Sequence, residues 1–237
     1  MDNKLKTICI IPARGGSKGL INKNLKKINN KPLIYYPIAA AIESNVCNKI
    51  LVSTDSLEIS KVAKKYGAEA PFLRESKFAK DRTTTEETLK EALKQAERYY
   101  NCSYDICVFL TANNIFRKSE WITKAVNILK NDKKIDSAFS VHKLYKHFWH
   151  KDKSGNLKKI LPWMKEYTSR QIAPNLYLEQ TSLACATRSK FWRKGKRIGE
   201  KVKLIINEDS FSTIDIHSEE DLYMARMAMN YKKKNNV

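Results

Sequence analysis

The chain has 237 residues, enough to bury one substantial core, and 42% of them are hydrophobic, as in an ordinary globular domain and unlike a disordered chain. The formal net charge of +20 raises the question of nucleic-acid binding. However, the lysines are spread through almost every segment, whereas a nucleic-acid site gathers them on one face. We therefore expect a solvated, lysine-rich surface that attracts small polyanions, and no nucleic-acid partner.

The cysteines and the apolar runs bear on the compartment. The five cysteines are odd in number and lack the spacing of a zinc site or a redox motif, so we interpret them as reduced thiols. Residues 1–16 lack the apolar stretch of a signal peptide, and no apolar run approaches the roughly 18 residues that a spanning helix needs. The sequence therefore predicts a cytoplasmic protein that does not insert into a membrane.

Apolar runs of strand length alternate with stretches of helical periodicity. In chain order, the pattern predicts a strand over residues 7–12, a helix over 33–44, a strand over 49–53, helices around the apolar faces 59–66 and 89–96, a strand over 105–110, a helix around 122–129, strands over 137–141, 182–186 and 202–206, and a last helix over 218–231. We expect one α/β domain over residues 1–237, a Rossmann-like three-layer sandwich with a mostly parallel central sheet. Such sheets bind ligands beyond the carboxyl ends of their strands.

One stretch breaks this alternation. From residue 145 to about 174 the chain contains two tryptophans, one glycine and two prolines, and no period is sustained. We interpret residues of about 145–180 as an arm inserted into the domain and suited to a contact between two copies of the chain. The tail, residues 231–237, holds three lysines and two asparagines and is expected to fray.

The first predicted strand runs directly into a glycine-rich loop, residues 13–19, with the sequence ARGGSKG. Its three glycines let the backbone turn tightly and bring N–H groups close to an anion, while Arg14, Lys18 and the following Lys23 supply positive charge. This composition predicts a phosphate cradle. It differs from the Walker A loop and from the dinucleotide GxGxxG fingerprint. The alternative is a structural turn with incidental basic residues.

Two strings carry a family resemblance: IPARGGSKGLINKNLKKINNKPLIYYPIAAAIES and VSTDSLEISKVAKKYGAEAPFLR. They resemble the opening of the acylneuraminate cytidylyltransferases, the CMP-sugar synthetases that activate sialic acid and related acidic sugars. The resemblance is strong over the N-terminal part of the chain and recurs in patches to the end. It implies an enzyme that transfers CMP from CTP to an acidic sugar, sialic acid or a related nonulosonate, with release of pyrophosphate. It also implies Mg²⁺ as cofactor and a homodimer.

The resemblance also implies which residues bind CTP. Lys18 and Lys23 would contact the phosphates and, with Arg14, stabilise the negative charge that develops during the reaction. In-line nucleotidyl transfer needs such cationic stabilisation, so the chemistry of these residues agrees with the resemblance. The implied nucleotide-binding residues are Ala13, Arg14, Gly15, Ser17, Lys18, Asn24, Arg74, Thr85 and Thr111.

Two later segments depart from the family pattern. Residues 110–117 read LTANNIFR where the family usually has LQPTSPLR, so Thr111 falls where a glutamine faces the base or ribose. Asn113 and Asn114 could replace the lost hydrogen bonds. Arg170 and Gln171 match a pair that the family places at the acidic sugar, whereas residues 177–182, with Gln180 as a further candidate sugar contact, differ from the usual Asn-Gly-Ala. The altered segment predicts a sugar or another acceptor that differs from sialic acid.

Residues 213–221 resemble the Asp-Ile-Asp stretch that holds magnesium in the family. Alternation along an extended segment puts Asp215 and His217 on one side, so both could address one ion. Imidazole is a poor ligand for Mg²⁺, so His217 could instead indicate tolerance of Mn²⁺, contact pyrophosphate, or lie beside the Ser218 N-cap of the last helix. Asp221 matches a family acid but is equally explained by the helix dipole. For Asp55, after the second strand, we expect a helix-capping role.

Two rival functions remain at this stage. One is a nucleotidyltransferase that uses another nucleotide or acceptor. The other is a non-catalytic nucleotide-binding protein that has kept the glycine-rich loop and lost the remaining chemistry.

Overall fold

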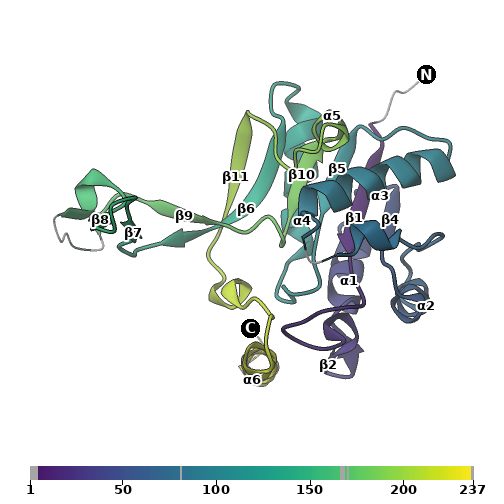
Figure 1. Ribbon diagram of the computed structural model, residues 1–237, viewed down its shortest axis with the longest axis horizontal. Coiled ribbons are helices and arrows are strands. Elements are labelled where there is room, and N and C mark those ends of the chain that lie inside the picture. The colour runs from purple at the N-terminus through teal and green to yellow at the C-terminus, as the bar shows by residue number, and fades with distance from the viewer. Residues whose placement is uncertain (1–4, 81, 166–168, 170, 236–237) are drawn as a thin grey trace.

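A computed structural model describes the chain except residues 1–4, 81, 166–168, 170 and 236–237 (Figure 1). The strands are β1 (Thr7–Pro12), β2 (Lys27–Ile28), β3 (Lys31–Pro32), β4 (Lys49–Ser53), β5 (Ile106–Phe109), β6 (Ser137–Leu144), β7 (Trp149–Lys151), β8 (Leu157–Lys159), β9 (Leu176–Glu179), β10 (Cys185–Arg188) and β11 (Val202–Asn207). The α-helices are α1 (Tyr35–Glu43), α2 (Leu57–Lys65), α3 (Thr85–Tyr99), α4 (Ser119–Asn131), α5 (Ser189–Arg193) and α6 (Glu219–Asn235). Short 3₁₀ helices are η1 (Lys23–Leu25), η2 (Ser76–Phe78), η3 (Pro162–Lys165) and η4 (Ser210–Thr213).

The central sheet has the strand order β11-β6-β10-β5-β1-β4, and β9 pairs with β6 in addition. β1 runs parallel to β4 and β5, and β11 runs parallel to β6. β10 lies antiparallel between β5 and β6. The predicted α/β fold with a mostly parallel sheet is confirmed, with β10 as an antiparallel strand in its middle.

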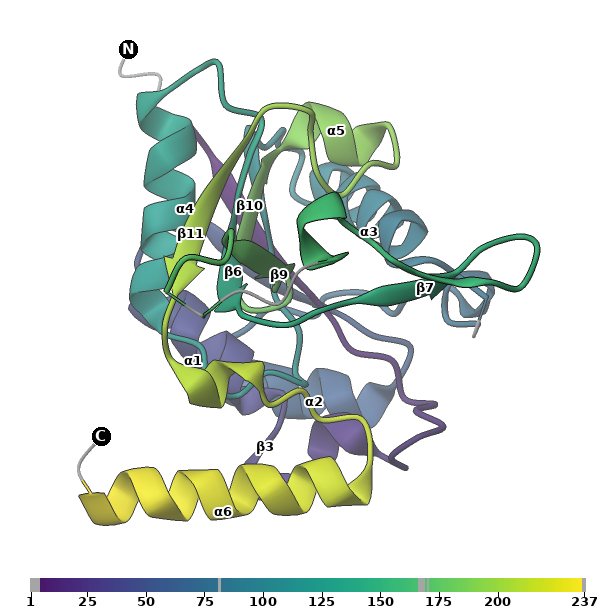
Figure 2. The same cartoon turned by 90° about the vertical axis from the view of Figure 1, so that its left-hand side faces the viewer.

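Helices cover both faces of the sheet, which gives three layers. Side chains of α1, α2, α4 and α6 share one buried cluster with alternate residues of the strands, such as Cys9 and Ile11 of β1. The residues between them, such as Ile8 and Ile10, face α3 and α5 in a second cluster. Figure 2 shows α4 on one side of the sheet and α3 with α5 on the other. Because both faces are covered, the strands β1, β4 and β5 consist mostly of apolar residues.

The predicted bounds of β1 and β4 agree with the structure, whereas β10 begins at Cys185 and not at Ser182. In the segment before β10, the buried guanidinium of Arg117 donates to the carbonyl oxygens of Ser182 (2.6 Å) and Leu183 (2.8 Å). These carbonyls are therefore used by a side chain before the strand begins.

The last helix is longer than predicted. The sequence suggested an end near Tyr231 and a frayed tail, but α6 continues to Asn235. Three lysines in its final turn, Lys232–234, interact favourably with the negative end of the helix dipole. Lys232 also lies over the Phe211 ring, 4.8 Å from its centroid.

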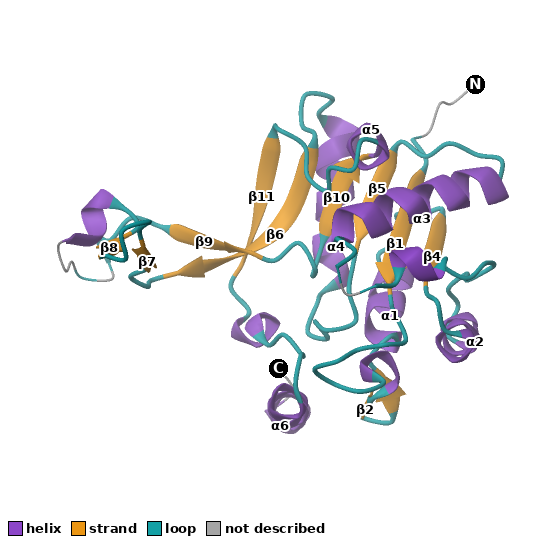
Figure 3. Cartoon of the chain, in the orientation of Figure 1, coloured by secondary structure: helices purple, strands orange, loops and turns teal. Residues whose placement is uncertain are grey.

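The stretch predicted as an arm, residues 145–180, projects from the body of the molecule (Figure 3). Its base is a two-stranded ribbon in which the end of β6 pairs with β9, from Val141 opposite Glu179 to Leu144 opposite Leu176. The β7–β8 hairpin and η3 lie farther out. The arm therefore grows out of the sheet itself, through a strand that leaves the core.

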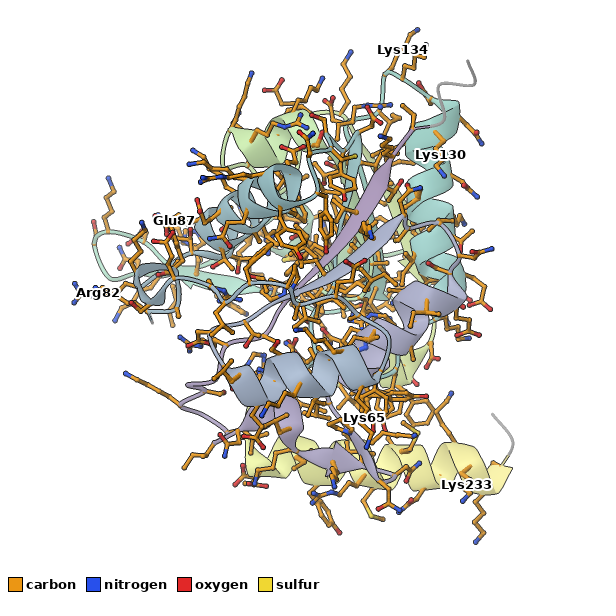
Figure 4. The ribbon with its side chains drawn as sticks, turned by 90° about the vertical axis from the view of Figure 1, so that its right-hand side faces the viewer. Lys65, Arg82, Glu87, Lys130, Lys134 and Lys233 are labelled. Carbon is orange, nitrogen blue, oxygen red and sulfur yellow. The ribbon has the colours of Figure 1, made fainter. Side chains whose placement is uncertain are left out.

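Figure 4 labels four lysines: Lys130 and Lys134 lie near each other at the end of α4 and in the loop after it, whereas Lys65 and Lys233 lie in other parts of the molecule. Lys65 ends α2, Lys130 lies in the last turn of α4, and Lys233 lies near the end of α6. This spread agrees with the expectation of a solvated basic surface. Within the described residues, no helix combines the length and the apolar character needed to cross a membrane.

Candidate active site

A cavity of about 440 Å³ lies where the 13–19 loop, the start of α3 and the segment after β5 meet. This is the carboxyl-terminal edge of the parallel strands β1 and β5, the expected place for a ligand in such a sheet. The lining residues are Pro12, Arg14, Ser17, Lys18, Gly19, Lys23, Asn24, Arg74, Phe78, Ala79, Lys80, Thr83, Thr85, Thr88, Phe109, Thr111, Ala112, Asn113 and His217. A larger cavity of about 700 Å³ lies along α4, with Glu43, Glu120 and Asp132 in its lining. The predicted cationic residues Arg14, Lys18 and Lys23 line the smaller cavity, so we place the candidate site there.

The end of β4 holds the 13–19 loop. Ala13 donates its N–H to the Ser53 carbonyl (2.9 Å), and Gly15 donates its N–H to the Asp55 carboxylate (2.8 Å). On the other side, the Asn24 amide donates to the Arg14 carbonyl (2.9 Å). Asn24 is buried, so it supports the loop in addition to lining the cavity. Ala13 and Gly15 lie beside the cavity and are absent from its lining.

The capping role predicted for Asp55 is wrong. The N-cap of α2 is Ser56, whose side chain accepts the Ile59 N–H (3.3 Å). Asp55 instead accepts the Gly15 N–H, forty residues earlier in the chain. A local pattern could not reveal this contact, because a Ser-Thr-Asp sequence before a helix fits a cap equally well.

Lys23 connects the loop region with the segment before α6. Its ammonium donates to the Ile216 carbonyl (3.2 Å). Burial lowers the pKa of Lys23, and Arg14 lowers it further, whereas Asp215 and Asp221 oppose the shift. Lys23 therefore lies at a junction where cationic and anionic residues from distant segments converge.

Gly19 marks the closest approach of these two segments. A Cβ atom added at Gly19 would lie 2.7 Å from the His217 carbonyl oxygen, nearer than real Cβ atoms come to a backbone atom. The sequence therefore needs glycine here so that the 13–19 loop and residues 215–217 can pass in contact.

Asp215, His217 and Asn113 form a cluster at the edge of the cavity. The Asp215 carboxylate lies 3.1 Å from Nε2 of His217 and accepts a hydrogen bond from the Asn113 amide. The Asn113 amide nitrogen is 3.4 Å from the same imidazole nitrogen. Sequence reasoning paired Asp215 with His217 but left Asn113 without a partner, and only the unusual Asn-Asn pair after β5 pointed to it.

Asp221 has a structural role. Its carboxylate accepts the N–H groups of His217 (2.8 Å) and Ser218 (2.9 Å), and Ser218 accepts the Asp221 N–H in return. These bonds lower the pKa of Asp221. Asp221 and Ser218 therefore fix the start of α6 and, through it, the backbone of residues 217 and 218.

The cavity wall opposite this cluster includes Arg74 and the start of α3. Arg74 is only 7% exposed and donates from Nε to the Ser53 hydroxyl (3.1 Å) and from Nη2 to the Ser53 carbonyl. Burial lowers its pKa to about 10, against the opposing influence of Asp55. Thr85 is the first residue of α3, so this wall also presents the positive end of a helix dipole.

The other predicted residues lie in different parts of the structure. Thr111 lines the cavity, and its hydroxyl oxygen is buried with no hydrogen-bond partner among the described residues. Gln180 is buried and lies outside the lining: its amide donates to the Ser212 carbonyl (3.1 Å) and accepts from Asn207 (2.7 Å). Both groups of the amide therefore have partners within the protein, and the sugar contact of Gln180 stays a prediction. Gln171 is an exposed residue of the arm, and Arg170 lies outside the described residues.

The comparisons with known proteins decide the family. The model of the family described as Cytidylyltransferase matches residues 8–234. The chain belongs to the cytidylyltransferase family. This cytidylyltransferase is 33% identical to the post-translational flagellin modification protein B of Campylobacter coli, over 96% of both chains. It is 32% identical to the CMP-N,N'-diacetyllegionaminic acid synthase of Campylobacter jejuni, over 95% of both chains.

The same fold occurs in a solved structure of CMP:2-keto-3-deoxy-manno-octonic acid synthetase complexed with CTP, with a TM-score of 0.70. The identity is 14%, and the match covers 96% of this cytidylyltransferase and 99% of that chain. At this identity the likeness establishes the fold alone.

Proposed function

We propose that this cytidylyltransferase transfers CMP from CTP to an acidic sugar of the nonulosonate class and releases pyrophosphate. The observation that carries the proposal is the cavity at the strand ends, where Arg14, Lys18 and Lys23 line the same space as His217. The relatives with CMP-acidic-sugar names support the acceptor class, because one of them aligns over 95% of both chains.

In this proposal the sugar hydroxyl attacks the α-phosphorus of CTP in line with the departing pyrophosphate. Arg14, Lys18 and Lys23 bind the phosphates and stabilise the charge on their oxygens. Thr111 is a candidate partner for the base or ribose, since its buried hydroxyl has no partner among the described residues. Arg74 and Thr85 complete the nucleotide wall.

A divalent cation fits this reaction, and it would neutralise phosphate charge when bound. We propose that Asp215 and His217 hold it, with the Asn113 amide group beside them. Carboxylate and amide oxygens suit Mg²⁺, and an imidazole nitrogen makes Mn²⁺ an alternative. Among the described residues, no group of three or more histidine, cysteine, aspartate and glutamate side chains forms a metal site. The cation would therefore take its remaining ligands from water and the CTP phosphates.

We also propose that the protein works as a homodimer. Figure 1 shows the arm projecting away from the body of its own chain. We place Gln171, an exposed residue of the arm, at the sugar that a second copy binds. Exposed apolar side chains follow the arm and the neighbouring edge strand β11; they are Phe148, Trp149, Leu157, Ile160, Ile172, Tyr177, Leu178, Val202, Leu204 and Ile206. The cysteines are all free, which suits a reaction in the reducing cytoplasm.

The nucleotide is tested by pyrophosphate release from CTP, UTP, ATP and GTP, with a panel of nonulosonates and with Mg²⁺ or Mn²⁺. We expect release to be fastest with CTP, and Lys18→Ala to lower kcat by about 100-fold because a charge-stabilising group is lost. Lys94→Ala, which removes an exposed lysine of α3, is the matched control and should leave the rate unchanged. Faster release from another nucleotide would overturn the assignment of CTP.

A further inference from the structure

The turn after β4 is a meeting point for the parts of the candidate site. Ser53, the last residue of β4, accepts the Ala13 N–H and two hydrogen bonds from the Arg74 guanidinium. The Thr54 carbonyl accepts the Arg74 N–H (2.7 Å). Asp55, the next residue, accepts the Gly15 N–H (2.8 Å). One short turn therefore holds both the 13–19 loop and Arg74.

Within this turn, Asp55 bonds to Gly15, the residue that follows Arg14 in the loop. In the chain, Gly15 lies between Arg14 and the pair Ser17 and Lys18, and all three of these neighbours line the cavity. A Cβ atom at Gly15 would lie 3.2 Å from the Ser56 Cβ, so the loop passes close against this turn. A hydrogen bond at Gly15 therefore sets the direction in which the loop leaves β1.

The same bond determines which N–H groups remain for a ligand. The Gly15 N–H already has an acceptor in Asp55, so it is not among the donors that meet a phosphate in this arrangement. Asp55 is exposed, and its negative charge also opposes the lowering of the Arg74 pKa that burial causes. The Asp55 carboxylate thus bonds to Gly15 and interacts electrostatically with Arg74, although Asp55 does not line the cavity itself.

We infer that Asp55 is a positioning residue for nucleotide binding: its carboxylate fixes Gly15 and thereby sets Arg14 and Lys18 at the cavity. This inference rests on the proposed function, because it takes the ligand of the loop to be the triphosphate of CTP. The contrary reading is that Asp55 competes with a phosphate for the Gly15 N–H. The two readings predict opposite changes in the apparent affinity for CTP.

The test compares Asp55→Ala, Asp55→Asn and the control Glu58→Ala, which removes an exposed carboxylate from the first turn of α2. Asn keeps an oxygen that accepts the Gly15 N–H but lacks the charge, so it separates geometry from electrostatics. We expect Asp55→Ala to raise KM for CTP about tenfold and to lower kcat as well, because Arg14 and Lys18 are displaced, and Asp55→Asn to stay within about twofold of the wild type in both constants. A KM for Asp55→Ala that is lower than or equal to the wild-type value would overturn the inference.

A second measurement needs no ligand and separates this inference from the proposed function. Amide hydrogen exchange of Gly15 in the free protein should become faster in Asp55→Ala and stay close to the wild-type rate in Asp55→Asn and Glu58→Ala. Unchanged exchange in Asp55→Ala would overturn the positioning role even if CTP proved not to be the substrate. Faster exchange with no turnover of CTP by the wild type would instead count against the proposed function alone.

Discussion

Gly19 shows how a single residue can join two halves of a site. The His217 carbonyl oxygen occupies the space that a side chain would need, so any larger residue must push apart the 13–19 loop and the 215–217 segment. These are the segments to which we assign phosphate and metal binding. A shift of this kind alters the alignment of the reacting groups more than the stability of the core.

We therefore predict that Gly19→Ala lowers kcat/KM for CTP by at least about tenfold, because misplacement of binding groups by a fraction of an ångström is costly in catalysis. Steady-state kinetics would measure the loss, and thermal unfolding would report on the fold. Gly16→Ala is the comparison within the same loop: it also removes a glycine, but a Cβ at Gly16 meets no protein atom within 4 Å. Equal activity of the two variants would show that the contact at Gly19 has no role in the site.

Some of these residues could be predicted from sequence and others could not. Arg14, Lys18 and Lys23 were accessible because a glycine-rich turn with basic residues is a local signal that spans few positions. The contacts of Asp55 and Asn113 were not, because their partners lie 40 and 102 residues away in the chain. Their roles depend on how strands are ordered in the sheet, and a single sequence does not reveal that order.

At the scale of the elements, Asp136 contacts two other segments at the end of the sheet where β6 begins. It precedes β6, accepts the Lys201 N–H before β11 (3.1 Å), and lies 3.3 Å from the Lys190 ammonium of α5. Burial acts to raise the pKa of Asp136, but the hydrogen bond from Lys201 and the charge of Lys190 outweigh it, so the pKa is lowered. The ionised carboxylate is therefore the form that the folded protein favours.

The sign of the pH dependence follows from this shift. Because the folded protein holds the pKa below its unfolded value of about 3.9, the stabilisation is present above that value and is lost as pH falls through the folded pKa. We predict that Asp136→Asn lowers the urea midpoint at pH 7, and that its stability then falls less steeply than that of the wild type on acidification below about pH 4. Urea unfolding at several pH values measures both effects. Parallel pH profiles of wild type and variant would contradict the prediction, and Glu120→Gln, an exposed residue of α4, serves as control.

The elements also show where periodicity is informative. The bounds of β1 and β4 followed from apolar runs that are buried on both faces. The start of β10 did not follow from its apolar run, and the residues before it, Ser182 and Leu183, contact the buried Arg117, a partner that no local pattern shows. The length of α6 was underestimated because its last turn is rich in lysine, which resembles a frayed tail although it suits a helix end.

At the scale of the whole molecule, the uncovered apolar surface supports a second copy as the partner. On β11, the side chains of Val202, Leu204 and Ile206 alternate along one face and are 41%, 38% and 49% exposed. Leu204 and Ile206 pair with Phe139 and Val141 of β6, the strand that carries the arm. β11 therefore lies beside the strand that carries the arm, so one self-complementary interface can include both.

We predict that the wild type sediments as a dimer at micromolar concentration, and that the double variant Leu204→Asp/Ile206→Asp sediments as a monomer with an unchanged circular dichroism spectrum. Charged side chains at these positions would be buried without partners in the interface. Tyr223→Ser, which removes an exposed ring from α6, is the control and should leave the dimer intact. A monomeric wild type would contradict the proposal.

The central claim is the transfer of CMP to an acidic sugar, and mass spectrometry of the products tests it most directly. The protein is incubated with CTP, Mg²⁺ and a panel of nonulosonates and related keto-acid sugars. We predict a CMP-sugar from at least one acceptor, together with an equal amount of pyrophosphate, and loss of both products in Lys18→Ala. Binding of CTP with no CMP-sugar from any acceptor, with either Mg²⁺ or Mn²⁺, would contradict the claim.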